Sequence, residues 1–486
     1  MKRFFPILIA VLMSSLMMAQ QQSLTLEEAI ALAHERSVDA SVALNRLKTA
    51  YWEYRTHKAE QLPEITFKAT APSYANNYTR MQLDDGSYTY LKNDILSMSG
   101  SVVVDQNIPF TGGRLSLSSS LEYINSNEAE EFLSVPVALT LSQPILGVNN
   151  QKWQRRIEPV RYREAKQEYV KSIEEVTITT LGYFFNLLLA RENYDIALQN
   201  HENAERLFTI ARAKREIGQI SESDLMQLEL SALQMKANLT KAQSELNANM
   251  FRISSFLAID DSVELKPIVP DVIPAMHLSY DKVLSMAHTN NPFAENVLRR
   301  QLQSDYAVAV SKGNRRQINL YASIGNTGRN KSFSTAYDDV KNYSQVEVGL
   351  SIPLVDWGKR KGQVKVAQSN RDVEMSRIRQ EEMSFNQNVY LLVENFNNQS
   401  EQVNISVAAD RIAQQRYNTA IETFMVGQIS ILDLNDARQS KDNARQKYIE
   451  ELYYYWNYFY TVRSTTLYDF MADRTLNVDF DTLVRK

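Results

Sequence analysis

A segment near the C-terminus, Gly427 to Leu434, repeats an earlier segment, Gly218 to Leu225, at a shift of 209 residues. Both begin Gly-Gln-Ile-Ser and end Asp-Leu, so the aspartate stands six residues after the glycine in each. The same shift aligns Leu141 to Pro144 with Leu350 to Pro353. Because each copy of a duplicated sequence folds by the same plan, this feature constrains the architecture more than any local motif. The chain is predicted to consist of two structural repeats.

The two repeats differ in length. Ala33 and His34 align with Ala287 and His288 at a shift of about 254 residues, so the first repeat carries roughly 44 extra residues. Prolines between the repeats break any helix and indicate a linker. The expected division is a signal peptide 1–19, a first repeat 20–266, a Pro-rich linker 267–276, a second repeat 277–470 and a C-terminal tail 471–486.

Each repeat passes through the same succession of hydrophobic periodicities. A helical segment opens it, Leu26 to Gln61 or Tyr280 to Lys312. Apolar residues then alternate with polar ones, which predicts strands. The first repeat is expected to hold about four strands and the second two. They cover Ile65–Ala71, Ser101–Ile108, Leu115–Leu121 and Val137–Ile145, then Ile318–Ile324 and Val346–Leu354. Gly325 to Tyr343, rich in Gly, Asn and Ser, is expected to be an exposed loop.

Long helices are predicted after Pro144 and Pro353. From Gln363 to Val426 there is neither Gly nor Pro over 64 residues, which corresponds to a helix of roughly 96 Å. Pro159 predicts a kink or a late start in the first long helix. The returning helix of the first repeat has apolar residues at 3-4 spacing, the pattern of coiled-coil packing. These are Leu225, Leu228, Ala232, Met235, Leu239, Ala242, Leu246, Asn249, Ile253 and Phe256. The returning helix of the second repeat keeps the pattern less well, because the charged residues Lys441 and Glu451 occupy two of its apolar positions.

The N-terminus has the order of a secretory signal peptide. Lys2 and Arg3 precede an apolar run that ends before Ala19. No later stretch reaches the roughly 18 apolar residues of a membrane-spanning helix. The chain has no cysteine, and its net charge of −4 gives no attraction to nucleic acid. We therefore expect an exported protein that neither binds nucleic acid nor carries a lipid on cysteine.

The predicted strands are long enough for a hydrocarbon core, but four to six per chain cannot close a barrel. An open sheet edge in lipid leaves backbone groups unpaired, so several chains would have to share one barrel. The alternative is a small sandwich of strands at the end of a coiled-coil rod. Such a chain would be a structural or adaptor protein of the periplasm without channel activity.

From Leu24 to Leu467 the chain resembles the TolC-type outer-membrane efflux factor family. The resemblance rests on the duplicated plan, the opening Ala287 to Pro292, the Ser-x-Pro junctions at Pro144 and Pro353, and both glycine turns. It implies an α+β membrane protein, a homotrimer in which one outer-membrane β-barrel continues into a long α-helical coiled-coil barrel in the periplasm. The family's usual barrel has four strands per chain, so the six predicted here depart from it.

The resemblance also implies a function. It is that of a passive exit duct of a tripartite efflux or type I secretion system. The partners would be a periplasmic adaptor (membrane fusion protein) and an inner-membrane transporter of the RND, ABC or MFS type. The exported substrate is not indicated by the sequence. The histidines show no metal-ligand spacing and no nucleotide fingerprint is present, so we assign no catalytic, cofactor or metal residue and expect no enzyme.

The repeated segment marks the turns between the long helices. Glycine suits a helix reversal and Ser221 or Ser430 can cap the returning helix. The resemblance implies that these turns form the periplasmic tip where the adaptor docks, with contacts from Gly218, Gln219, Ser221, Asp224, Gly427, Gln428 and Ser430.

The resemblance assigns a gate to Asp433 and Asp436, which would form rings of carboxylates in the trimer. Such rings would raise one another's pKa and attract cations. The alternative is that they stabilise the start of a helix. The first repeat has Gln227 at the place of the second acid. Some family members have a tyrosine and an arginine where Phe424 and Ile429 stand, so a latch here would use packing or other polar partners.

Overall fold

The computed structural model describes residues 22–126, 130–260, 263–270, 276–315, 317–351, 355–426 and 428–485. The predicted signal peptide 1–19 and part of the predicted linker, 271–275, lie outside these residues. The chain forms two compact units, and each takes segments from both repeats. The first unit is Met1–Lys48, Ala165–Ala294 and Glu382–Lys486, and the second is Thr49–Glu164 and Glu295–Glu381.

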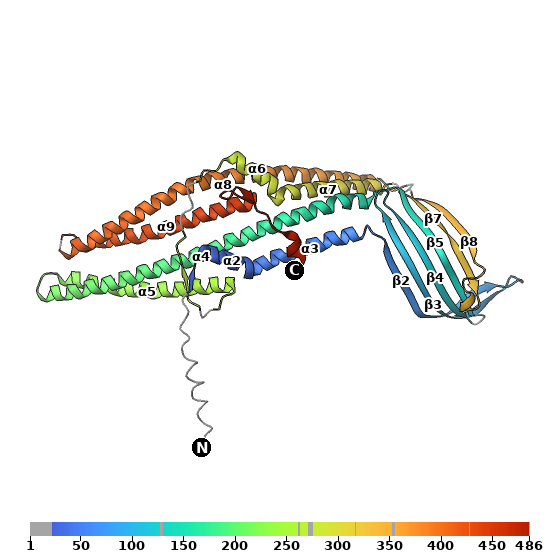
Figure 1. Ribbon diagram of the computed structural model, residues 1–486, viewed down its shortest axis with the longest axis horizontal. Helices are drawn as coiled ribbons and strands as arrows, with labels where there is room; N and C mark the ends of the chain where they lie inside the picture. Colours follow the sequence, from blue (N-terminus) through green and yellow to red (C-terminus); the bar gives the residue numbers. More distant parts are fainter. Residues whose placement is uncertain are drawn as a thin grey trace, which may run out of the picture. The chain divides into compact units, whose positions relative to one another are not determined.

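The second unit contains one six-stranded antiparallel sheet (Figure 1). Its strands, in spatial order, are β2 (Glu64–Gln82), β3 (Tyr88–Ile108), β4 (Gly113–Ser126), β5 (Glu130–Leu146), β7 (Gln317–Asn330) and β8 (Lys341–Ser351). The two repeats meet where β5 pairs with β7, with Leu139 opposite Ile324. The extra hairpin of the first repeat, β3 and β4, lies inside this sheet.

Several strands are longer than the hydrophobic alternation predicted. The β2–β3 hairpin continues to a turn in which Gly86 has φ +82°, and Asn76 pairs with Asp94 within it. The predicted loop from Gly325 to Tyr343 is wrong at both ends, since Asn326 pairs with Asn342 in the β7–β8 ladder. Backbone hydrogen bonds form a ladder whatever the side chains are, so polar extensions of a hairpin give no periodic signal.

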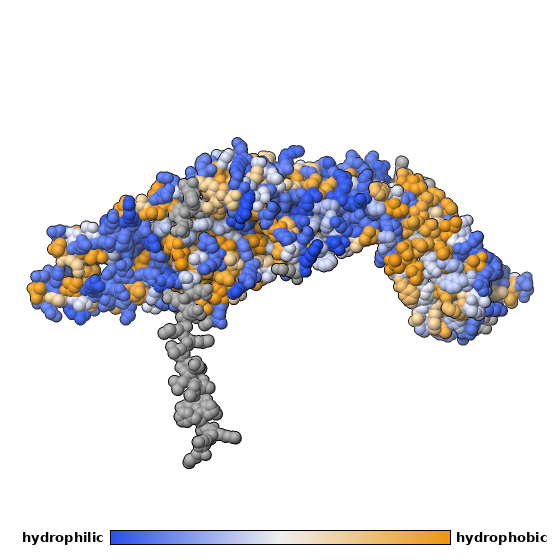
Figure 2. All heavy atoms as spheres, viewed as in Figure 1, coloured by the Kyte–Doolittle hydropathy of each residue, from blue (hydrophilic) through white to orange (hydrophobic). Residues whose placement is uncertain are grey.

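The sheet has one apolar and one largely polar face, and the apolar face is exposed in the single chain. Phe67 lies opposite Val102, and Leu117 lies opposite Leu139. Exposed side chains of the apolar face are Ile65, Phe67, Val102, Leu117, Leu139, Ile324, Val346 and Val348. Hydrophobic residues gather over the sheet in Figure 2. The other face carries residues such as Ser116, whose hydroxyl donates to Asp105.

Helices of the second unit continue directly from the sheet. They are the C-terminal part of α3 (Val38–Ala59), the start of α4 (Asn150–Glu216), most of α7 (Pro292–Gly313) and the start of α8 (Lys359–Met425). The predicted late start of the first long helix is wrong, because α4 begins at Asn150 and includes Pro159. Within the described residues, no helix combines the length and the hydropathy needed to cross a membrane.

The first unit contains the two helical hairpins, α4 with α5 (Glu222–Leu257) and α8 with α9 (Ile431–Thr466), which lie side by side with their turns at the same end (Figure 1). It also holds α2 (Leu26–Arg36) and α6 (Tyr280–Asn290). The predicted opening helix of each repeat is interrupted at an equivalent residue, Ser37 or Asn291. Short elements complete it: β1 (Gln22–Leu24) with β6 (Leu265–Pro267), β9 (Tyr468–Asp469) with β10 (Arg474–Thr475), and α10 (Phe480–Arg485).

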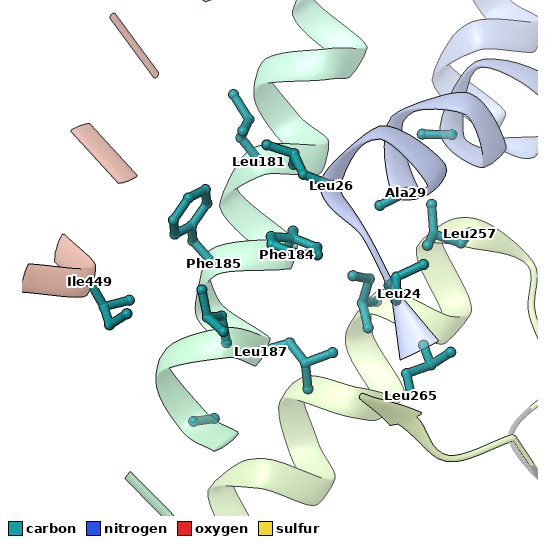
Figure 3. Packing of buried hydrophobic residues seen from close by; sticks show 14 of the residues in the cluster. Leu24, Leu26, Ala29, Leu181, Phe184, Phe185, Leu187, Leu257, Leu265 and Ile449 are labelled. Carbon is teal, nitrogen blue, oxygen red and sulfur yellow. The ribbon is translucent and has the colours of Figure 1, made fainter. Parts of the chain in front are cut away.

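A hydrophobic core joins these helices at the middle of the hairpins (Figure 3). Leu26 of α2, Phe184 of α4, Leu257 of α5 and Ile449 of α9 are all buried in it. The predicted 3-4 pattern of α5 is confirmed, since each of its members is buried or half-buried. The two charged residues in the equivalent pattern of α9 are buried as well, Lys441 at 3% exposure and Glu451 at 8%.

Candidate functional site

The first tip joins α4 to α5 through a helix end closed by glycine. The N–H of Gly218 donates to the carbonyl of Arg215 at 3.0 Å and that of Gln219 to Lys214 at 2.9 Å. This pair of bonds is a Schellman motif, which needs a left-handed residue, and Gly218 has φ +75°. Ser221 is then the N-cap of α5. The glycine of the repeated segment is therefore explained by the helix reversal at this tip.

The second tip joins α8 to α9 in the same way. The N–H of Gln428 donates to the carbonyl of Thr423 at 3.0 Å, which is the bond equivalent to that of Gln219. Ser430 is the N-cap of α9. Gly427 lies outside the described residues. The sequence repeat thus corresponds to a repeated turn of the backbone.

The aspartates six residues after the glycines complete a capping box at each tip. The Ser221 hydroxyl donates to Asp224 at 2.7 Å, and the Ser430 hydroxyl donates to Asp433 at 2.7 Å. The N–H of Asp433 donates back to the Ser430 hydroxyl at 3.2 Å. The Asp433 carboxylate accepts from both the hydroxyl and the backbone N–H of Ser430, and these two bonds, aided by the charge of Arg416, lower the pKa of Asp433. Within one chain, therefore, Asp433 stabilises the start of α9 and is held in its ionised form.

Asp436 has a different partner. Arg416 of α8 donates to the Asp436 carboxylate at 2.5 Å and to the hydroxyl of Ser440 at 3.2 Å. The equivalent residues of the first tip are Leu207 and Gln227. The second tip therefore has both an additional acid, Asp436, and an ion pair between its two helices, which the first tip lacks at the equivalent residues. Arg416 was not predicted from the sequence, although Arg416 and Asp436 are placed symmetrically about the turn of a helical hairpin.

A groove of about 700 Å³ lies between the two tips. Residues of both hairpins line it, among them Lys214, Gln219, Asp224, Phe424, Ile429 and Leu432. Beside it, Phe424 and Ile429 pack with Leu207 against the buried residues Tyr417 and Leu434. This cluster joins the two hairpins of one chain.

Polar contacts hold α4 against the second hairpin above the groove. The Asn200 amide donates to Asp442 at 2.8 Å, and the Gln446 amide donates to Asn193 at 2.9 Å. Arg445 contacts Glu192 of α4 at 2.9 Å. These contacts join α4 to the second hairpin within the first unit.

The sequence also predicted strand-to-helix junctions at Pro144 and Pro353. Pro144 lies in β5 opposite Asn319, close to the strand's end at Leu146. Pro353 lies outside the described residues. Across the described ranges, no group of three or more metal-ligating side chains is found.

The chain is similar in structure to outer membrane channels. It matches CmeC of Campylobacter jejuni at a TM-score of 0.67 and 16% identity, covering 95% of this chain and 88% of that one. VceC of Vibrio cholerae gives 0.63 and 13%, with 91% and 95% covered. The open state of MtrE of Neisseria gonorrhoeae gives 0.60 and 13%, with 93% and 91% covered. These identities are low, so the comparisons show a shared fold.

Sequence comparison gives the family. A search of curated proteins finds no match. The family model for the outer membrane efflux protein matches residues 29–257 and 283–457, which is most of the chain. Its two matched segments lie in the two predicted repeats, and the α+β two-repeat fold predicted from the sequence is confirmed. This chain belongs to the outer membrane efflux protein family, whose members reside in the outer membrane.

Proposed function

We propose that three copies of this chain form one channel, the passive exit duct of a tripartite efflux or type I secretion system. The observation that carries the proposal is the six-stranded sheet of the described residues, with its apolar face exposed and with β2 and β8 at its two edges. Lipid tolerates no unpaired sheet edge. Because the strand number is even, β8 of one copy runs antiparallel to β2 of the next, so copies can close a barrel without breaking the pattern.

The runner-up is a periplasmic structural or adaptor coiled-coil protein without channel activity. A sheet in water buries its apolar face and exposes its polar one. This sheet leaves its apolar face exposed, which supports the duct and disfavours the runner-up.

The groove between the tips is the proposed docking surface for the periplasmic adaptor, which would connect the duct to an inner-membrane transporter. The groove combines an apolar wall, including Phe424 and Leu432, with the polar residues Lys214, Gln219 and Asp224. Mixed lining of this kind suits a helical partner that lays an apolar stripe into a groove with a polar rim. Gly218, Ser221, Gln428 and Ser430 support the docking surface by fixing the two turns.

The proposed gate is at Asp433 and Asp436 of the second tip. In a trimer these residues form two sets of three carboxylates. Asp433 stays ionised through its capping bonds, while Arg416 offsets the charge of Asp436. The gate charge therefore depends on the Arg416–Asp436 pair.

Single-channel recording in planar bilayers tests the gate. We expect Asp436→Asn to raise conductance and weaken block by divalent cations, and Arg416→Gln to strengthen that block severalfold because it leaves Asp436 uncompensated. The double variant Asp433→Ala with Asp436→Ala should weaken block further. Gln227→Ala, at the equivalent place in the first tip, is the matched control and should change neither property.

If Asp436→Asn and Arg416→Gln shift the block in the same direction, Asp436 is only a structural partner of Arg416 and the gate assignment fails. A chain extracted from cells without detergent, as a monomer lacking conductance, would contradict the duct itself.

A further inference from the structure

Four chain links meet at the end of the sheet where the helices begin. They are the β3–β4 turn 109–112, the β5–α4 link 147–149, the described part of the α7–β7 link, 314–315, and the β8–α8 link from 355 to 358. Hydrogen bonds connect them in pairs. The Asn149 amide donates to the carbonyls of Pro109 and Phe110 at 2.9 and 3.1 Å, and Arg360 donates to the carbonyl of Asn314 at 2.8 Å. We call this end of the second unit the junction.

The junction is rich in cations. The residues in and beside these links include nine cationic side chains, Arg114, Lys152, Arg155, Arg156, Lys312, Arg315, Lys359, Arg360 and Lys361. All are exposed except Arg360, which is half-buried. Within the described part of the chain, none of the nine forms an ion pair with a carboxylate. Arginines further along the same helices do, as in the Arg163–Glu295 and Arg299–Glu164 pairs.

Few acids balance these cations. Asp356 is the one acid of the β8–α8 link, and its carboxylate accepts from the N–H of Gly358 at 2.9 Å and that of Arg360 at 3.3 Å. The α3–β2 link at the same end adds Lys58, Glu60 and Glu64. The junction therefore carries a clear excess of positive charge, and that charge faces solvent in the single chain.

Two large aromatic side chains project from the same links. Trp357 is 95% exposed and Phe110 is 84% exposed. Trp357 has φ +51°, a left-handed conformation that is costly for any residue with a β-carbon. The guanidinium of Arg155 lies 5.4 Å from the centre of the Phe110 ring. An exposed aromatic ring beside unpaired cations is complementary to a binding partner that has an apolar region next to an anionic one.

We propose that the junction is a binding site for anionic glycerophospholipid head groups. Trp357 would lie at the boundary between acyl chains and head groups, where its amphipathic ring is favoured, and the apolar ring of Phe110 would contact acyl chains. Arg155, Lys359 and Lys361 would then contact lipid phosphate groups, which carry the complementary charge. The orientation rests on the proposed function, in which the helices extend into the periplasm and the junction meets the phospholipid leaflet facing it.

Brominated lipids test the site, because bromine quenches tryptophan fluorescence at short range. The full chain is placed in nanodiscs of phosphatidylcholine with a minor fraction of phosphatidylglycerol. Two samples are prepared, one with brominated phosphatidylglycerol and one with an equal amount of brominated phosphatidylcholine. Subtracting the signal of Trp357→Phe isolates Trp357. We expect phosphatidylglycerol to quench Trp357 severalfold more than phosphatidylcholine at equal brominated fraction, since each nearby cation favours an anionic lipid by a factor of about five.

The charge variant is Arg155→Gln with Lys359→Gln and Lys361→Gln. It should retain quenching of Trp357 but lose the preference for phosphatidylglycerol. Its matched control removes three exposed cations of the first unit, Lys236→Gln, Lys241→Gln and Arg411→Gln, and should keep the preference. Lys359→Arg with Lys361→Arg keeps the charge and should also keep it. Circular dichroism of each variant checks that the helical content is unchanged.

Three results would overturn the site. If neither brominated lipid quenches Trp357, this residue does not lie at a lipid surface. If the charge variant still prefers phosphatidylglycerol, the preference does not come from these cations. Adding inorganic phosphate at constant ionic strength separates the sources, because full competition by free phosphate would assign the site to a soluble anion instead. Conductance of the same variants, recorded in planar bilayers, distinguishes a failed lipid site from a failed duct.

Discussion

His34 is a half-buried titratable residue in the first unit. Its Nε2 lies 2.7 Å from the Thr177 hydroxyl of α4. Burial, and then the charge of Arg463, lower the pKa of His34 from its ordinary value of 6.5. Glu174 is only 4% exposed and pairs with Arg463 at 3.0 Å. Burial raises the pKa of this carboxyl, against the opposing effect of Arg463.

The lowered pKa of His34 predicts a loss of stability on acidification. The folded chain binds fewer protons here than the unfolded chain, so stability is present above pH 6.5 and falls as pH drops through the folded-state pKa. The raised pKa of Glu174 acts in the opposite sense, because its ionisation destabilises the fold as pH rises. Comparing thermal unfolding of wild type and His34→Gln between about pH 7.5 and about pH 5.5 isolates the histidine.

We expect wild type to lose more stability on acidification than His34→Gln. The matched control is His288→Gln, since His288 holds the equivalent place in the second repeat but is exposed, with its Nε2 3.0 Å from Asn386. Equal acid sensitivity in wild type and His34→Gln would contradict the role of burial at His34.

The sequence predicted the tip residues unequally well. Ser221 and Ser430 were expected as caps because serine before a helical pattern has a local chemical reason to be there. Arg416 was not found, since an exposed arginine in a long charged helix gives no periodic signal. Only the symmetry of the hairpin about its turn relates it to Asp436.

At the scale of elements, the interior of the second hairpin contains a buried cation. Lys441 of α9 is 3% exposed, with its Nζ 4.7 Å from the centre of the Tyr417 ring and 3.1 Å from Asp442. Asp442 also accepts from Asn200 of α4. The charged residue that weakened the predicted coiled-coil pattern is thus accommodated by an aromatic ring and a countercharge that the pattern alone does not reveal.

Removing the countercharge should cost more than removing the cation. We expect Asp442→Asn to lower the free energy of unfolding by about 3–5 kcal/mol, because it leaves a buried ammonium without its partner. Lys441→Met leaves Asp442 without its countercharge, but Asp442 is 14% exposed and still accepts from Asn200, so this variant should destabilise less than Asp442→Asn. Urea-induced loss of the helical circular dichroism signal measures both variants. The assignment fails if Lys441→Met destabilises as much as Asp442→Asn.

The predicted elements agree with the structure where side-chain periodicity is strong. Every member of the 3-4 pattern in α5 is buried or half-buried, and the six strands are all present. The hairpin residues 72–100 were not predicted as strand, because they mix a proline with asparagines and tyrosines without alternation. Their pairing depends on the backbone ladder and on the turn at Gly86.

At the scale of the whole molecule, the sequence repeats and the compact units do not coincide. Each repeat contributes strands to the second unit and a helical hairpin to the first. Sequence self-similarity finds duplicated segments, whereas compactness depends on which segments pack together. The pairing of β5 with β7 could not be read from either repeat alone.

The exposed apolar face of the sheet makes a prediction about insertion. Val348 of β8 is 61% exposed on that face, and its neighbour Glu347 lies on the other. In lipid, Val348→Arg should cost about 2–4 kcal/mol near the middle of the bilayer. We expect it to reduce the amount of trimer recovered from outer membranes, measured by heat-modifiable mobility on gels, while Glu347→Arg is tolerated. Equal recovery of the two variants would mean that the apolar face does not meet lipid.

The number of strands per chain has a consequence for what can pass. In the proposed trimer, three six-stranded sheets would form a barrel of eighteen strands, against twelve for a barrel built from four strands per chain. Barrel diameter grows roughly linearly with strand number, so the outer aperture would be about one and a half times as wide. In the proposed duct, so wide an outer opening would leave the proposed gate at the hairpin tips as the size filter for cargo. Molecules that pass the tips would then leave the cell unhindered.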